Sequence, residues 1–422
     1  MFQTASIIIS VAALLSWANY KYIRLPSTIG VMLISLLASI ALVAFGEAEI
    51  GFRGRLAQLV AGIDFHAVVF HGLLPFLLFA GALHVDLNDL KREWLAVTLL
   101  ALLGTAVSMF AVAGGLYLIL SWLGLPAPWI GCLLFGALIS PTDPVAVLGI
   151  MKAVGAPKAI ETQIAGESLF NDGVGVVAFT ALLAVAAGES LPSPTGAAIL
   201  LIREAGGGIF VGAAIGALAT QLLRRVDRYQ IEILLTLAVA MGSYAVAEAV
   251  HASAPIAVVA AGLFIGNQGR ASSMSPETER RVDEFWELID EFLNIVLFLL
   301  MGLEVLVLPL RAASFWAGVA AIVVSLLARW IIVAAIAGML RTAGRELCGG
   351  AVVILTWGGL RGGVSLALAL ALPLADYRDT LFAAAYIVVV FSIVVQGLTV
   401  GAVIRAMRPT DRRLLRGVGR HE

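Results

Sequence analysis

A short polar stretch, Gly166-Glu-Ser-Leu-Phe-Asn-Asp-Gly173, lies inside the otherwise apolar run 160–187. At about 100° per residue, four of its side chains face one sector of a helix: Glu167, Ser168, Asn171 and Asp172. Their oxygen atoms are the ligands that a hard cation prefers. A polar seam that joins neighbouring helices is the alternative. Two acids so close together at membrane depth favour an ion site. Burying ionisable groups in a membrane costs free energy, so such groups usually have a functional role.

The whole chain is unusually apolar. Of its 422 residues, 61% are hydrophobic and 13% are charged, about half the charged fraction of an average soluble protein, and its mean hydropathy is +1.00. Such a chain cannot cover its surface with polar groups in water, so its solvent is the lipid bilayer. The net charge of −1 gives no reason to expect a nucleic-acid partner. Cys132 and Cys348 lie in apolar runs without metal-ligand spacing.

Long apolar runs recur along the chain and predict an all-α integral membrane protein. The expected spans are 3–21, 26–45, 65–84, 94–122, 127–151, 160–187, 196–223, 231–250, 254–268, 281–304, 312–340, 347–372 and 380–406. These are thirteen helices, and the short segment 254–268 leaves twelve open. No basic residue precedes the first run, whereas a signal peptide begins with basic residues, so this run is expected to be a retained helix.

The distribution of Lys and Arg predicts the orientation. Of the 27 basic residues, 20 fall in the C-terminal tail and in the alternate loops that begin after the first helix, and 5 fall in the opposite loops. Basic residues prefer cytoplasmic loops. We therefore expect an N-terminus outside and a C-terminus in the cytoplasm. The remaining two, Arg329 and Arg361, fall inside helices and need an anionic partner or water.

Two predicted helices carry signals for interruption. Ser140-Pro-Thr-Asp-Pro144 places prolines on both sides of Asp143, and Trp357-Gly-Gly-Leu-Arg-Gly-Gly363 surrounds Arg361 with glycine. Both residue types weaken a helix interior. Helices broken at the bilayer midplane, in matching positions of two halves, are typical of transporters with inverted repeats. We therefore expect two inverted repeats with broken crossing helices 5 and 12. A simple proline kink with Asp143 as a helix cap is the alternative at the first position.

Several motifs resemble the monovalent cation:proton antiporter superfamily, and in particular its NhaP-type branch, which includes the animal Na⁺/H⁺ exchangers. They are SPTDPVAV at 140–147, GESLFNDGVGVV at 166–177, LLAR at 326–329 and GGLRGGVSLALAL at 358–370. Weaker matches at 285–304 and 394–400 extend the resemblance over nearly the whole chain.

The resemblance implies a role for each polar residue near the first break. Asp172 would bind the cation and the proton alternately. Asp143, Ser168 and the backbone carbonyl of Thr142 would be further ligands of the transported Na⁺. Asn171 would contribute to the same ion site, and the Asn-Asp pair that it forms with Asp172 is typical of the electroneutral branch, which implies one proton per cation.

The resemblance also implies structural roles for the buried charges. Glu167 would pair with Arg329, and Arg361 would balance the negative helix ends at the second break. One position departs from the family pattern. Several prokaryotic relatives have a glutamate in the third helix where this chain aligns with Ala80, so the selectivity between Na⁺, Li⁺ and K⁺ stays open.

The expected organisation is a scaffold and an ion-carrying core. The resemblance implies that the scaffold forms a homodimer and that the protein lies in a bacterial-type plasma membrane. The boundaries are 1–92 for scaffold helices 1–3, 93–188 for core helices 4–6, 189–306 for linker helix 7 and scaffold helices 8–10, 307–407 for core helices 11–13, and 408–422 for a short basic cytoplasmic tail. Within helix 10, the cluster Glu277 to Glu291 is interpreted as an amphipathic, partly wet beginning, and Asn294 as a buried helix contact.

The predicted function is exchange of Na⁺ or Li⁺ for H⁺ by alternating access, one for one, without a cofactor. Two alternatives remain open: a K⁺/H⁺ antiporter with the same residues, and a sodium-coupled symporter of an organic anion on a related fold. An enzyme is not expected, because the sequence contains no Ser-His-Asp set, zinc-binding HExxH motif or phosphate-binding loop.

Overall fold

The computed structural model describes residues 2–45, 54, 59–60, 62–125, 127–188, 194–308, 311–345, 347–373 and 376–407. Within these residues every extended regular element is a helix, and the only β-type pairing is an isolated bridge between Asp143 and Leu360. The predicted all-α architecture is therefore confirmed. The predicted tail 408–422 lies outside the described residues.

The first half of the chain forms long helices, one of them interrupted. Its helices are α1 (Phe2–Ala18), α2 (Ser27–Phe45), α4 (Phe65–Ala67), α5 (Leu74–Leu83), α6 (Leu87–Arg92), α7 (Trp94–Thr98), α8 (Thr105–Trp122), α9 (Trp129–Ile139), α10 (Val145–Val154) and α11 (Lys158–Ala186). Wider π-helical turns connect α4 to α5 and α7 to α8, so each pair forms one continuous rod. The predicted span 127–151 is divided into α9 and α10, as the two prolines indicated.

The second half follows the same plan. Its helices are α12 (Pro194–Leu223), α13 (Tyr229–Ala249), α14 (Ala254–Phe264), α15 (Arg270–Ser273), α16 (Pro276–Leu303), α17 (Ala312–Thr342), α18 (Ala351–Trp357), α19 (Gly363–Leu370), α20 (Arg378–Phe391) and α21 (Gly397–Met407). The glycine-rich segment divides 347–372 into α18 and α19, so both predicted interruptions are present. Helical repeats are not evident from these bounds and stay a prediction.

Nine helical segments of the described residues are long and apolar enough to cross a membrane. Three shorter apolar helices, α9, α10 and the segment Ala254–Gly269, accompany them. Helix α16 is long enough but begins with many charged residues. The thirteen-helix count remains a prediction.

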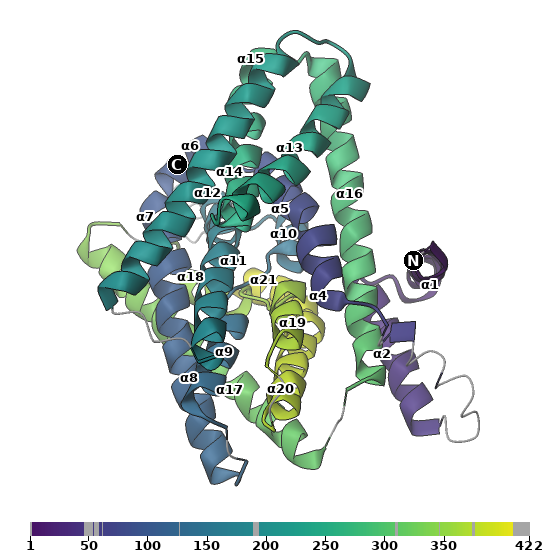
Figure 1. The fold of residues 1–422 in the computed structure, drawn as a ribbon, viewed down its shortest axis with the longest axis vertical. Coiled ribbons are helices and arrows are strands. Elements are labelled where there is room, and N and C mark those ends of the chain that lie inside the picture. The colour runs from purple at the N-terminus through teal and green to yellow at the C-terminus, as the bar shows by residue number, and fades with distance from the viewer. Residues whose placement is uncertain are drawn as a thin grey trace, which may run out of the picture.

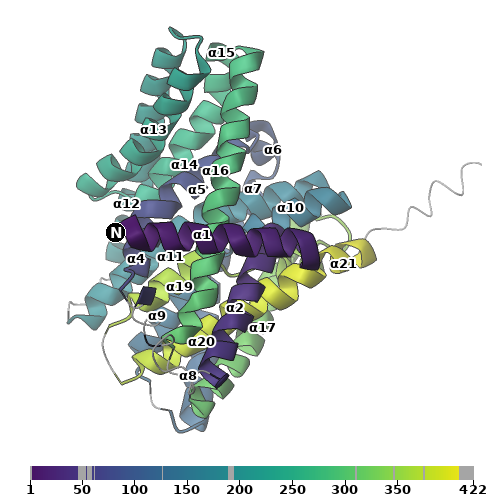
Figure 2. The ribbon, with the colours of Figure 1, turned by 90° about the vertical axis from the view of Figure 1, so that its right-hand side faces the viewer.

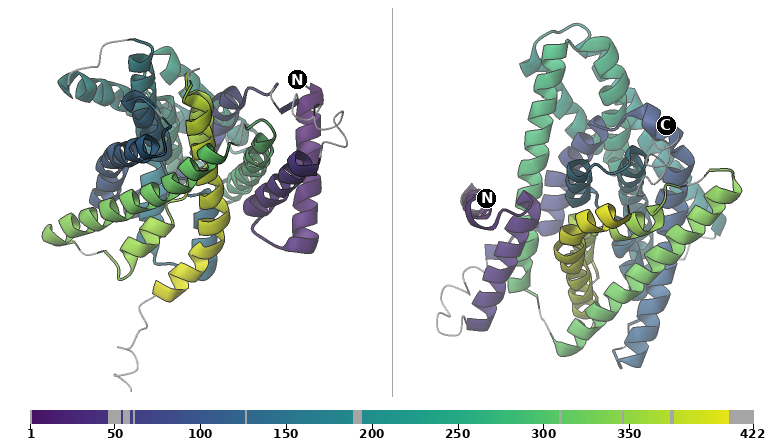
Figure 3. Two further views of the ribbon diagram at one scale, coloured as in Figure 1. Left: turned by 90° about the horizontal axis from the view of Figure 1, so that it is seen from below. Right: turned by 180° about the vertical axis from the view of Figure 1, so that it is seen from behind.

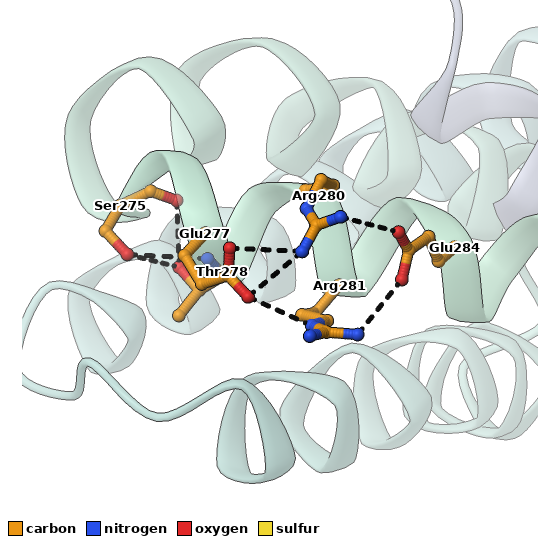
Figure 4. Close-up of polar contacts among 6 residues, drawn as sticks. All are labelled: Ser275, Glu277, Thr278, Arg280, Arg281 and Glu284. Atoms are coloured by element: carbon orange, nitrogen blue, oxygen red, sulfur yellow. Dashed lines mark hydrogen bonds and ion pairs between the residues drawn. The ribbon is translucent and has the colours of Figure 1, made fainter.

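The charged beginning of α16 is shown in Figure 4. Ser275 caps the helix by accepting a hydrogen bond from the Thr278 N–H. Arg280 and Arg281 each pair with both Glu277 and Glu284, at 3.1–3.4 Å. These side chains are about half exposed, so their ion pairs contribute little to the stability of the fold.

The helices pack as two groups. Figure 1 shows α16 as a long rod on one flank, with α12, α13 and α14 toward one end of the molecule and α8, α17 and α20 toward the other. Helix α14 packs against α5, α12 and α13, and α16 packs against α2 and α5. Helix α17 packs against α8 and α20, and α9 packs against α8 and α11. Three of the four halves of the broken helices pack within the second group: α9 against α8, α18 against α17, and α19 against α20.

Two helices run obliquely to the rest. Helix α1 lies across α16 (Figure 2), and most of its large apolar side chains are exposed. Seen from behind, α17 runs diagonally along the molecule (Figure 3) and contacts α20. The apolar surface of α1 is free to face lipid or another protein.

Candidate functional site

The first break lies between the end of α9 and the beginning of α10. Pro141 and Pro144 prevent a continuous helix here. The Asp143 carboxylate accepts a hydrogen bond from the Val145 N–H at 2.9 Å, so one of its oxygen atoms caps the start of α10.

The two breaks touch each other. The Asp143 N–H donates a hydrogen bond to the Leu360 carbonyl at 2.8 Å. A Cβ atom at Gly362 would overlap the Asp143 carboxylate, so the backbone of the second break can come this close only with glycine at 362. The contact joins residues more than two hundred positions apart and holds the carboxylate in place.

Arg361 crosses from the second break to the first. Its guanidinium donates hydrogen bonds to the carbonyls of Ser140 and Pro141, at the negative C-terminal end of α9. Its hydrogen bonds therefore go to the first break, while the expected compensation of the helix ends at its own break stays a prediction. The carbonyl of Trp357, at the end of α18, instead accepts a hydrogen bond from the Gln396 side chain at 3.0 Å.

Asp172 lies at the midpoint of α11, fourteen residues from either end. At 1.5 Å per residue, about 21 Å of helix separates it from each end, which corresponds to the middle of a bilayer. The side chain is buried, with 8% of its surface exposed. Among the described residues, no basic nitrogen lies within 4.0 Å of Asp172 or Asp143. The two carboxylates are therefore free of ion pairs.

Two further polar residues of α11 hold the first break. The Ser168 hydroxyl donates to the Thr142 carbonyl at 2.5 Å, and the Asn171 amide donates to the Thr142 hydroxyl at 2.8 Å. Ser168 uses its proton in this bond, so its lone pairs remain available for a cation. Asn171 is fully buried behind Thr142. Of the five predicted ion ligands, Asn171 alone does not line the cavity described below.

Glu167 points away from the other acids and meets Arg329 of α17. Arg329 donates two hydrogen bonds to the Glu167 carboxylate, the longer one at 2.7 Å. Arg329 also donates to the Leu355 carbonyl in the last turn of α18, at 3.2 Å. Both charged side chains are almost completely buried. A buried bidentate pair of this kind neutralises both charges and leaves Asp172 and Asp143 as the unpaired acids of the site.

A cavity of about 390 Å³ connects these unpaired acids with one end of the molecule. Its walls come from α5, α10, α11, α16 and the second break. Near the site it is lined by Thr142, Asp143, Ser168 and Asp172, and at its mouth by Asp86, Asp89, Lys152, Lys158 and Glu161. Ala80 also lies on the wall, so the position that departs from the family pattern faces the same space.

Three polar residues of α16 line the cavity and were not predicted as functional: Glu287, Asp290 and Asn294. Their spacing of three and four residues places them on one helix face. This spacing is visible in the sequence. It gave no signal because acids at the beginning of an amphipathic helix usually face water.

Comparisons with known proteins show the family. Residues 8–406 match the family model described as "Sodium/hydrogen exchanger, transmembrane". The chain is 47% identical over 412 residues to the Na(+)/H(+) antiporter NhaP of Pseudomonas aeruginosa, covering 96% of both chains, and 33% identical over 392 residues to the Na(+)/H(+) antiporter NhaH of Halobacillus aidingensis, covering 92% of this chain and 93% of that one.

The fold is also similar to a solved structure. The sodium proton antiporter MjNhaP1 from Methanocaldococcus jannaschii superimposes with a TM-score of 0.72 at 19% identity, over 95% of this chain and 97% of that one. This chain belongs to the sodium/hydrogen exchanger family, in its NhaP-type branch. Members of the family are transporters rather than enzymes, and the ions are substrates, not cofactors.

Proposed function

We propose that this chain exchanges Na⁺ for H⁺ across the membrane, with Asp172 as the carboxylate that holds either ion. The observation that carries the proposal is an unpaired, buried carboxylate at the midpoint of a membrane helix, at the inner end of a cavity. Family membership and the names of the relatives support the same exchange.

Competition for Asp172 accounts for exchange. A bare carboxylate costs several kcal/mol in a nonpolar environment, so the closed form tolerates Asp172 only with a cation or a proton bound. A cation arriving from the cavity displaces the proton, and a proton arriving from the other side displaces the cation. The same cost suppresses leak, because an empty Asp172 cannot cross.

Four residues around the break form the proposed cation site: Asp172, Asp143, Ser168 and Thr142. Thr142 uses its backbone carbonyl. Asn171 supports this site indirectly, because it fixes the Thr142 side chain from behind. Glu167 is neutralised by Arg329, and one Asp143 oxygen accepts a hydrogen bond from the Val145 N–H, so we assign the proton exchange to Asp172. One titrating acid implies exchange of one proton per cation.

Movement of a core against a scaffold would provide alternating access. The cavity separates α5 and α16 from α10 and α11, and we assign these pairs to scaffold and core, with the boundaries that the sequence predicts. Lys152 and Lys158 lie at its mouth, and with the N-terminus outside this mouth faces the cytoplasm of a bacterial-type cell. The exposed apolar surface of α1 belongs to the scaffold, which we expect to form the homodimer.

The alternatives receive less support. The relatives carry Na⁺/H⁺ names, which does not favour K⁺ exchange. An organic anion would need a free cationic group at the site. Arg329 is paired with Glu167 and Arg361 is bonded to backbone carbonyls, so neither arginine is free to bind a substrate anion.

Proteoliposomes with an acidic interior and a pH-sensitive dye test the proposal. At zero membrane potential, Na⁺ or Li⁺ should dissipate the pH gradient and choline should not. Asp172→Asn should abolish the cation-dependent dye response while the protein stays folded. Retained exchange in Asp172→Asn would refute the mechanism. A response to K⁺ alone would change the cargo, and no response to any cation would reopen the organic-anion alternative.

A further inference from the structure

A buried amide on α16 has no partner. Asn294 exposes 1% of its surface, and neither its Oδ1 nor its Nδ2 makes a hydrogen bond within the described part of the chain. An unsatisfied buried polar group costs about 1–3 kcal/mol, so such groups call for a specific explanation. Asn294 lines the cavity, which provides room for the missing partner.

Asp290 lies one helical turn before Asn294 and also lines the cavity. Side chains four residues apart on a helix have Cβ atoms about 5–6 Å apart, a gap that one cation can bridge. Asp290 has no basic nitrogen within 4.0 Å among the described residues. The Asp290 carboxylate, which has no ion pair among the described residues, and the unsatisfied Asn294 amide form an oxygen-rich pair on the α16 wall of the cavity.

The position of this pair is intermediate along the cavity. Glu287 lies one turn closer to the mouth, and Leu297 lies one turn deeper, where its side chain packs against Gly363 of the second break. Asp290 and Asp143 line the same cavity, so their like charges oppose each other across it. A cation between them would relieve this repulsion.

The balance of charge also favours a cation. Seven carboxylates line the cavity: Asp86, Asp89, Asp143, Glu161, Asp172, Glu287 and Asp290. The cationic side chains that line it are two lysines and His84. Lys158 pairs with Glu161 at 3.8 Å, and both lysines belong to the mouth. A cavity of one dominant sign concentrates ions of the opposite charge.

We propose that Asp290 and Asn294 form a second, low-affinity site for a partly hydrated monovalent cation on the α16 wall. The cation waits there before it passes to Asp143 and Asp172. The identity of the cargo rests on the proposed function, but the site itself does not require that exchange occurs. On this basis α16 is part of the ion path and not only a scaffold element.

Binding without transport is the direct test. The protein is studied in detergent at alkaline pH, where free carboxylates are ionised, and the NMR line width of the sodium nucleus is followed as Na⁺ binds and Li⁺ displaces it. Asp172→Asn should keep part of the Li⁺-sensitive broadening, and Asp172→Asn with Asp290→Asn should lose it. Loss of all such broadening in Asp172→Asn alone would overturn the second site.

Glu291→Gln is the matched control. Glu291 follows Asp290 on α16, but it accepts a hydrogen bond from Ser27 of α2 at 3.0 Å and does not line the cavity. Both substitutions remove one carboxylate charge. Asp290→Asn should raise the apparent KM for Na⁺ about two- to fivefold, the size expected for one partly solvated charge, with Vmax unchanged, and Glu291→Gln should leave both unchanged. Equal effects would overturn the proposal.

Asn294→Leu separates a binding role from a structural one. Leucine has a similar size and removes both unsatisfied atoms, so thermal stability should be retained or increased while the residual sodium broadening in the Asp172→Asn background falls. Unchanged broadening would overturn the proposal. A native protein that binds Na⁺ at both sites yet fails to exchange it for protons would refute the proposed function and leave this second site standing.

Discussion

Both broken helices are interrupted by a short non-helical segment, but one segment carries an acidic residue and the other a basic one. The α9–α10 break carries Asp143 and Thr142 beside the cavity, whereas the α18–α19 break contains one cation, Arg361, and four glycines. The first break supplies ligands. The second supplies a guanidinium for the end of α9 and enough space for the Asp143 carboxylate. The first break therefore forms part of the proposed ion site, and the second break holds the first one in position.

The difference shows how buried charges can be divided between structure and transport. Both buried arginines are committed to fixed partners, Arg329 to Glu167 and Arg361 to the carbonyls of α9. The acids that the mechanism needs, Asp172 and Asp143, are left without basic partners in the described part of the chain. A mobile cation can then take the place that an arginine would otherwise hold.

The largest expected effect comes from the structural pair. Glu167→Ala leaves Arg329 as an uncompensated buried charge, which costs about 3–5 kcal/mol, so the apparent Tm in detergent should fall strongly. The double variant Glu167→Ala with Arg329→Ala removes both charges and should recover part of this loss. Additive losses in the double variant would show that the two side chains do not act as a pair.

A smaller but more local effect is expected from Gly362→Ala, which tests the contact between the breaks. The added Cβ would overlap the Asp143 carboxylate, so this side chain must move, at a cost of about 1–3 kcal/mol. Na⁺-dependent proton exchange should fall more than stability does. Gly242→Ala on α13 is the control, because a Cβ there meets nothing within 4 Å. Full activity in Gly362→Ala would mean that the breaks need not touch.

Local patterns in the sequence predicted both interruptions, because proline and glycine act on the backbone where they stand. Helical periodicity also predicted a polar sector on α11, but of its four residues only Ser168 and Asp172 line the cavity. The partner of Arg361 was not predicted, because Ser140 and Pro141 lie more than two hundred residues away in the chain. For the same reason the cavity face of α16 was missed. Periodicity shows that Asp290 and Asn294 share a face, but not which neighbour that face meets.

The carbonyl ends of the two breaks offer a weaker test of the comparison. Gln396→Leu leaves the Trp357 carbonyl without its neutral donor, which should cost about 1–2 kcal/mol, whereas Arg361→Gln removes a charged donor from two carbonyls and should cost about twice as much. Thermal melts of the two variants under identical conditions compare them. Equal losses would show that the charge of Arg361 is not needed at the end of α9.

The smallest change is expected from Asn171→Asp, which adds an acid next to Asp172. In the structure this side chain lies behind Thr142, outside the cavity. An acid sealed there lacks a water path for its proton and can keep that proton to bond the Thr142 hydroxyl. Exchange should therefore remain electroneutral, and an imposed potassium diffusion potential in proteoliposomes should not drive it. Exchange that responds to the potential would show that position 171 itself exchanges a proton, and that one residue beside Asp172 sets the number of charges moved.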